Sequence, residues 1–133
     1  MVCVQCGKNT QVFNSRPQKR FNKIWRRRRC VACKSVFTTV ESALYDELWV
    51  VEDQNKAIKP FSRDKLFLSL HSSLSHRKTA INDAGALCDT IIKKLAPYSS
   101  NGKLKSSDII KSTEVALNRF DKLASAHYRA HHS

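Results

Sequence analysis

Hydrophobic residues in the second half of the chain recur with the period of an α-helix. A first helix is expected to begin after Ser62, because a serine side chain can cap a helix N-terminus. Its apolar face comprises Leu66, Phe67, Leu70 and Leu74. A second helix is expected to end at Pro97, since proline interrupts helical hydrogen bonding. The apolar face of this helix comprises Ala84, Leu87, Cys88, Ile91, Ile92 and Leu95, which makes Cys88 a core residue.

Two further helices are expected after a loop rich in Ser, Asn and Gly. Ser106 can cap the first of them, and the second covers residues 121–132. The apolar face of the first comprises Ile109, Ile110, Thr113, Ala116, Leu117 and Phe120. The C-terminal region is therefore predicted to be mostly helical.

Residues of high β-propensity in the first third of the chain indicate strands instead. Three strands are predicted, over residues 10–16, 21–29 and 36–40, and Pro17 is expected to end the first. A small hairpin is predicted from residues 48–51 and 56–59, around a turn signal at residues 53–55. The fold class is thus α+β, with an all-β domain over residues 1–44 and a mostly helical domain over residues 45–133.

Length and composition are those of a folded protein. The chain has 133 residues and is 41% hydrophobic, which suits one medium or two small domains and is too apolar for wholesale disorder. No charged leader precedes an apolar stretch, and no apolar run reaches the roughly 18 residues of a membrane span. A soluble, cytoplasmic protein is expected.

Two pairs of cysteines form the sharpest motif. Cys3 and Cys6 are followed, after a gap of 23 residues, by Cys30 and Cys33. Each CxxC turn can place two thiolates on one side of a tetrahedral Zn²⁺, and four ligands leave no open position for catalysis. Gly7 can adopt the left-handed conformation that such a turn favours. One structural Zn²⁺ per chain is predicted, and the alternative is a pair of redox CxxC motifs or incidental cysteines.

Positive charge is concentrated near these cysteines. The net charge is +13, of which residues 1–44 contribute +9 and contain a single acid, Glu41. This distribution indicates a surface that binds a polyanion, and the candidate residues are Arg16, Lys19, Arg20, Lys23, Arg26, Arg27, Arg28 and Arg29. On a strand, successive arginines point to opposite faces, so two of the last four can address one phosphate strand. The alternatives are a solvated charge run or a membrane surface.

The quoted motifs together resemble the zinc ribbon of NrdR-type bacterial repressors, which regulate ribonucleotide reductase genes. The matching segments are Cys3-x-x-Cys6-Gly7, Asn14-Ser15-Arg16-Pro17, residues 26–30 and Phe37-Thr38-Thr39-Val40-Glu41. The stretch that follows resembles the ATP-cone of the same proteins, a nucleotide-sensing fold of a β-hairpin and about four helices. The segments that match the ATP-cone are Val50-Val51, Pro60-Phe61-Ser62-x-x-Lys65-Leu66 and His76-Arg77.

The resemblance implies a nucleotide site in the second domain. Val50 and Val51 would lie beside an adenine nucleotide, ATP or dATP, and Lys65 and Arg77 would be among its phosphate partners. The family usually has a lysine after the paired valines, but this chain has Glu52, which cannot attract a phosphate. Lys56 and Lys59 could replace the missing charge, and the alternative is an oligomerisation domain with a degenerate pocket.

The function expected from this resemblance is transcriptional repression without enzymatic activity. A bound adenine nucleotide would select a homo-oligomer, and that oligomer would decide whether several ribbons meet double-stranded operator DNA together. Such a repressor would associate with the bacterial nucleoid. A different class of function is a basic zinc ribbon that binds structured RNA. A zinc-dependent nuclease or redox enzyme is disfavoured, because no acid or histidine cluster accompanies the cysteines.

Overall fold

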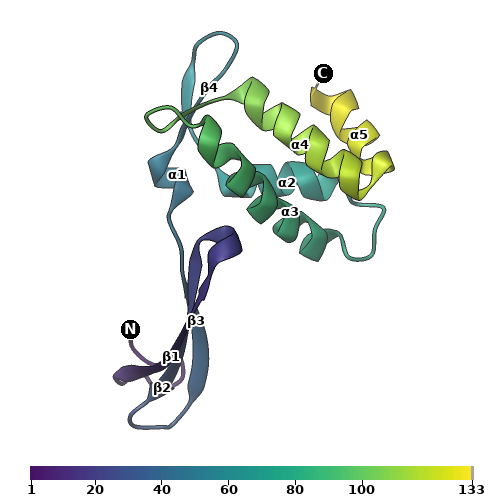
Figure 1. The fold of residues 1–133 in the computed structure, drawn as a ribbon. Coiled ribbons are helices and arrows are strands. Elements are labelled where there is room, and N and C mark those ends of the chain that lie inside the picture. The colour runs from purple at the N-terminus through teal and green to yellow at the C-terminus, as the bar shows by residue number, and fades with distance from the viewer. Residues whose placement is uncertain (133) are drawn as a thin grey trace. The chain divides into compact units, whose positions relative to one another are not determined.

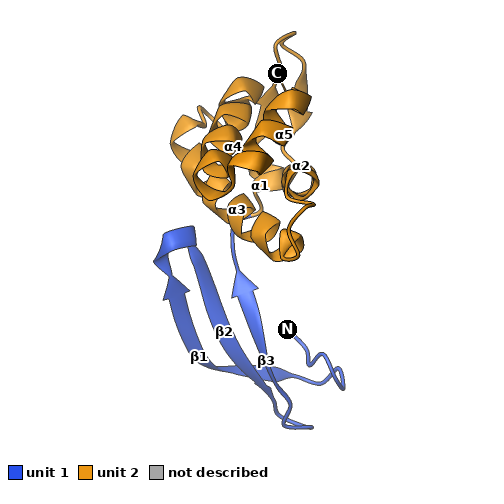
Figure 2. Cartoon of the chain, turned by 90° about the vertical axis from the view of Figure 1, so that its right-hand side faces the viewer, with its two compact units in different colours: residues 1–43 blue, residues 44–133 orange. Residues whose placement is uncertain are grey.

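The computed structural model of the protein describes residues 1–132 and divides the chain into two compact units. Unit 1 is Met1–Ala43 and unit 2 is Leu44–Ser133 (Figure 2). Unit 1 consists of strands and turns, whereas unit 2 is mostly helical with a small sheet (Figure 1). The predicted α+β fold class is therefore confirmed. No helix among residues 1–132 is long and apolar enough to cross a membrane.

Unit 1 is a three-stranded antiparallel sheet in the order β1-β2-β3. The strands are β1 (Thr10–Gln18), β2 (Lys23–Cys30) and β3 (Val36–Glu41). Pro17 does not end the first strand, contrary to expectation, but continues it and pairs with Ile24. An edge strand tolerates proline, because only one side of it needs donors for the sheet. The second strand begins two residues later than expected, after the short 3₁₀ helix η1 (Lys19–Phe21) and the left-handed Asn22.

Unit 1 buries very little apolar surface. Among its described residues, only the cysteines Cys3 and Cys30 are fully buried, while Phe13 and Trp25 are half exposed. A module this poor in buried apolar groups lacks the hydrophobic free energy to fold alone, so its stability must come largely from a bound metal.

Unit 2 combines helices with a second three-stranded sheet. Its elements are α1 (Tyr45–Leu48), β4 (Val50–Glu52), β5 (Ile58–Pro60), α2 (Arg63–Ser73), α3 (Ala80–Leu95), η2 (Ala96–Tyr98), β6 (Lys103–Lys105), α4 (Ser106–Phe120) and α5 (Lys122–His132). The sheet order is β5-β4-β6, with β5 antiparallel and β6 parallel to β4. The four longer helices pack against one another (Figure 1).

The helices of unit 2 follow the hydrophobic pattern of the sequence. Ser62 caps α2 as expected, since its Oγ accepts a hydrogen bond from the Lys65 amide at 3.2 Å. Cys88 is fully buried in the core, as expected. Ser106 was expected to cap α4, but it is the first helical residue and Lys105 stands at the cap without a side-chain bond. Two short elements, α1 and β6, were not expected from the sequence.

Candidate functional sites

The four cysteines of the two CxxC motifs converge on one point in unit 1. Cys30 is the last residue of β2, and Cys33 lies in the turn that leads into β3. All four Sγ atoms lie within 4.8 Å of one another, with 3.6 Å between Cys3 and Cys33 and 3.4 Å between Cys6 and Cys30. A tetrahedron with Zn–S bonds of about 2.3 Å has S–S edges of about 3.8 Å. The donor set and its spacing therefore fit a structural Zn²⁺.

Backbone amides of both turns point at sulfur. The Gln5 amide donates to Cys3 Sγ at 3.3 Å, and the Cys33 amide donates to Cys30 Sγ at 3.4 Å. Gly7 has the left-handed φ of +76° that was expected for it, and Lys34 has a φ of +66° at the matching position of the second turn. Such amides stabilise thiolates, which are the form that binds metal.

Neighbouring groups shift the pKa values of three of the four cysteines even without a metal. The Ser35 hydroxyl, 3.1 Å from Cys33 Sγ, is the main cause that lowers the pKa of Cys33 to about 6. The Cys33 amide is the main cause that lowers the pKa of Cys30. The Lys8 amide lowers the pKa of Cys6, but the Cys30 thiol and burial raise it further, to about 11. Zinc binding must therefore release protons from the less acidic thiols.

The eight basic residues proposed for DNA contact all lie on the β1–β2 hairpin. Arg16 is on β1, Lys19 and Arg20 are in η1, and Lys23 begins β2. The arginines Arg26, Arg27, Arg28 and Arg29 follow one another along the central strand. Their exposure alternates, because Arg27 and Arg29 are exposed whereas Arg26 and Arg28 are half-buried. The hairpin thus brings these charges together but distributes the block over two faces.

Unit 2 contains a cavity of about 290 Å³ between its small sheet and three helices. Three residues from the nucleotide prediction line it, namely Val51 of β4, Lys59 of β5 and Lys65 of α2. Lys65 lies in the first turn of α2, where its charge favours an anion, while the Lys65 amide already donates to Ser62 Oγ and the Arg63 amide to Asp46. The cavity thus combines apolar side chains with two lysines, one acid (Asp53) and several other polar groups, an arrangement that can hold a ligand with an apolar ring and polar substituents.

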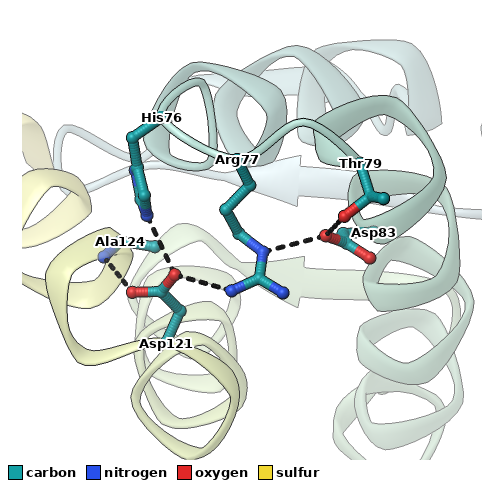
Figure 3. Close-up of polar contacts among 6 residues, drawn as sticks. All are labelled: His76, Arg77, Thr79, Asp83, Asp121 and Ala124. Carbon is teal, nitrogen blue, oxygen red and sulfur yellow. Dashed lines mark hydrogen bonds and ion pairs between the residues drawn. The ribbon is translucent and has the colours of Figure 1, made fainter.

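The other three residues of the nucleotide prediction do not line this cavity. Val50 adjoins Val51 on β4, and consecutive side chains of a strand point to opposite faces. Lys56 is exposed in the turn of the hairpin, where it has a left-handed φ of +64°. Arg77 lies in the connection between α2 and α3 and is held by two carboxylates there, as Figure 3 shows.

The Arg77 network ties three helices together. Arg77 Nε donates to Asp83 at 3.0 Å, Nη1 donates to Asp121 at 3.1 Å, and the guanidinium lies 4.6 Å from the centre of the Phe120 ring. Asp121 also contacts His76 Nε2 at 2.9 Å and accepts from the Ala124 amide at the start of α5 (Figure 3). His76 is the main cause that lowers the pKa of Asp121 to about 2. Arg77 is therefore engaged in a structural network.

Glu52 does not face the cavity. Its carboxylate lies 4.0 Å from Lys103 of β6 and lines a separate hollow with Lys105. The Glu52 carboxylate therefore lies on a different surface from the cavity lined by Val51 and Lys65. It would not repel a phosphate in that cavity as directly as the sequence suggested.

Five residues from the C-terminal helices also line the cavity and were not identified as site residues from the sequence. They are Ser106, Ile109 and Ile110 of α4, and Tyr128 and His132 of α5. The hydrophobic periodicity marked the two isoleucines as core, and no local motif connects residues this far from Lys65 along the chain. Only the packing of α4 and α5 against α2 brings them to the cavity.

Comparison with known proteins finds similarity along nearly the whole chain. Residues 1–41 match a family model described as "Transcriptional repressor NrdR-like, N-terminal domain". A protein named transcriptional repressor NrdR from Rhodospirillum centenum is 35% identical over 129 residues, which cover 96% of this chain and 82% of that protein. The chain belongs to the NrdR family. A relative of the same name from Bradyrhizobium diazoefficiens is 36% identical over 93% of this chain and 77% of its own length.

Membership of this family supports a structural zinc in the four-cysteine cluster. The match to the NrdR model covers all four cysteines, the hairpin and the whole of β3. The matches to NrdR proteins also extend through unit 2, so the cavity lies in a region shared with these relatives.

Proposed function

We propose that this NrdR-family protein is a zinc-dependent transcriptional repressor that responds to adenine nucleotides and binds operator DNA of ribonucleotide reductase genes. Unit 1 is the DNA-binding domain, and unit 2 senses ATP or dATP and assembles the homo-oligomer. The protein acts by binding rather than by catalysis. The observation that carries this proposal is the four-cysteine cluster at the base of a hairpin that carries eight basic residues.

The physical support for DNA binding is electrostatic. Unit 1 has a large positive charge and only one carboxylate, so association with a polyanion releases counterions and is favoured by entropy. Because unit 1 buries so little apolar surface, the hairpin keeps its shape only while the metal holds its base. Zinc therefore controls DNA affinity indirectly, through the fold of the hairpin.

The physical support for nucleotide binding is the cavity of unit 2. Val51, Ile109 and Ile110 offer an apolar surface for an adenine ring, while the lysines Lys59 and Lys65 suit phosphate. Helix α5 contributes Tyr128 and His132 to the same cavity, so a ligand there would contact the C-terminal helix and could change its packing.

A competition experiment tests the DNA-binding half. The zinc-loaded protein is bound to a labelled duplex carrying paired operator sites from a ribonucleotide reductase gene and challenged with unlabelled duplex DNA or structured RNA. Preferential displacement by the operator duplex supports the proposal. Preferential displacement by RNA would support a second function, RNA binding, which the exposed aromatic side chains of the sheet favour because such groups stack on unpaired bases.

A further inference from the structure

The sheet of unit 1 has two chemically different faces. One face, here called the tryptophan face, carries Trp25, Arg27 and Arg29 on β2, all exposed. The opposite face carries Arg26, Arg28 and Cys30, which are half-buried or buried. Strand β3 repeats the alternation, since Val36, Thr38 and Val40 are more exposed than the residues between them. The four-arginine block is therefore two pairs in different surroundings.

The arginines of the opposite face are engaged within the sheet. Arg26 donates to Ser15 Oγ at 3.1 Å and lies 3.7 Å from the Glu41 carboxylate. Arg28 Nη1 donates to Thr10 Oγ1 at 3.3 Å, whereas its buried Nε has no hydrogen-bond partner among the described residues. Because Glu41 is the only acid of unit 1, its pairing with Arg26 leaves the tryptophan face without a carboxylate. The opposite pair thus links the strands of the sheet.

The tryptophan face has exposed aromatic rings among its cations. Phe13 is 50% exposed and Trp25 is 47% exposed, and both line a hollow of about 320 Å³ with Asn14, Arg16, Arg27 and Thr38. Arg26 also lines this hollow, although its guanidinium donates to Ser15 and lies near Glu41. The Arg29 guanidinium lies 4.7 Å from the centre of the Phe13 ring. Arg27 Nη1 donates to Thr38 Oγ1 at 2.8 Å, which uses one of its five N–H donors and orients the others.

Exposed aromatic rings flanked by arginines suit a nucleobase more than a phosphate alone. In a duplex, an aromatic ring offers an apolar surface to a base edge or a thymine methyl, while arginine donates to guanine edges and phosphates. We propose that the tryptophan face is the base-contacting surface of the protein, with Trp25 against the bases and Arg27 and Arg29 beside it. Arg26 and Arg28 are positioning residues. This inference rests on the proposed DNA-binding function.

Fluorescence gives a direct test, because the chain has two tryptophans and the other one, Trp49, is buried in unit 2. In a Trp49→Phe variant, all tryptophan emission comes from Trp25. Addition of duplex DNA should quench that emission with the same midpoint as DNA binding measured by anisotropy. Binding by anisotropy without a change in Trp25 emission would overturn the assignment of this face.

Matched arginine variants separate the two faces. Arg27→Ala with Arg29→Ala should reduce the slope of log affinity against log salt by about two, because about 0.9 counterions are released per phosphate contact. Arg26→Ala with Arg28→Ala should leave that slope unchanged while weakening zinc retention. Zinc content, measured on both variants, shows whether the fold survives. Replacement of Arg27 and Arg29 by lysine keeps the charge and should restore the slope.

Trp25→Ala completes the test, since it removes an apolar contact without a charge. Loss of one aromatic–base contact should lower DNA affinity by at least about fivefold with no change in the salt slope. Equal effects of the two arginine pairs, or no effect of Trp25→Ala, would refute the division of the faces while wild-type DNA binding persists. Failure of the zinc-loaded wild type to bind DNA would refute the proposed function itself.

Discussion

Individual side chains decide two features of this protein, the metal site and the junction of helices in unit 2. The metal site depends on two pairs of cysteines that are far apart in sequence. In each pair one cysteine is buried, Cys3 or Cys30, and the other is exposed, Cys6 or Cys33. The junction depends on Asp121, whose carboxylate receives His76, Arg77 and the Ala124 amide. In both places several groups converge on one point, so a single substitution should have a large effect.

Replacement of Cys30 by serine should remove zinc and DNA binding together. The change opens the tetrahedron, and unit 1 has no apolar core to hold its hairpin without the metal. Native mass spectrometry should find one zinc per wild-type chain and none in the variant. Cys88→Ser is the matched control, because Cys88 is buried in unit 2 and lies outside the cluster, so this variant should keep its zinc. Full DNA affinity in metal-free protein would contradict the prediction.

Replacement of Asp121 by asparagine should destabilise unit 2 by about 1.5–3 kcal/mol, the range for hydrogen bonds to charged groups. The pKa of Asp121 in the folded protein, about 2, lies below its ordinary value of 3.8. Its contribution to stability is therefore present above pH 3.8 and is lost as the pH falls towards 2. Urea unfolding at a series of pH values should therefore show the free energies of unfolding of wild type and variant converging as the pH falls from 3.8 to 2.

The control for Asp121 is Asp108→Asn, which removes a carboxylate from the first turn of α4. Favourable interaction of that charge with the helix dipole predicts a loss of only about 0.3–1 kcal/mol. A difference between wild type and Asp121→Asn that stays constant down to pH 2 would show that Asp121 contributes through packing and not through its charge.

At the scale of whole elements, the sequence predicts the long helices and the β4–β5 hairpin but misses the short elements α1 and β6. Helices α2, α3 and α4 were recognisable because their apolar residues recur over several turns. Strand β6 has only three residues, and its one buried side chain, Leu104, cannot show a period. The sequence also gave no sign that β6 pairs with β4, because that pairing joins segments about fifty residues apart. Local patterns carry no information about such contacts.

Strand β6 should nevertheless be important for stability. Leu104 is fully buried, so Leu104→Ala leaves a cavity and should lower the free energy of unfolding by about 2–5 kcal/mol. Leu123→Ala makes the same chemical change on α5 at a side chain that is 63% exposed, and should change that free energy by no more than about 0.5 kcal/mol. Urea unfolding measures both, and a similar loss in the two variants would show that β6 is not part of the core.

At the scale of the whole molecule, the proposal joins two units with separate tasks. The sequence located the metal ligands completely, since their chemistry requires a fixed spacing. It located the lining of the cavity in unit 2 only in part, since Lys65 belongs to a local motif whereas Tyr128 and His132 arrive by the packing of α5. The resemblance assigned phosphate contact to both Lys65 and Arg77. In the fold, Lys65 lines the cavity, whereas Arg77 does not and is bonded to Asp121. The regulatory function should therefore respond differently to these two residues.

Lys65→Ala should weaken binding of ATP and dATP without loss of stability, because Lys65 lines the cavity and its side chain is exposed. Arg77→Ala should instead lower the free energy of unfolding, because it leaves Asp83 and Asp121 without their arginine. Calorimetry with each nucleotide, urea unfolding, and oligomer size with and without nucleotide distinguish the two outcomes. Both variants retain unit 1 and should keep salt-sensitive DNA binding. If the wild type binds neither nucleotide, the sensing role of unit 2 is wrong, whereas the DNA-binding role of unit 1 still stands on its own measurements.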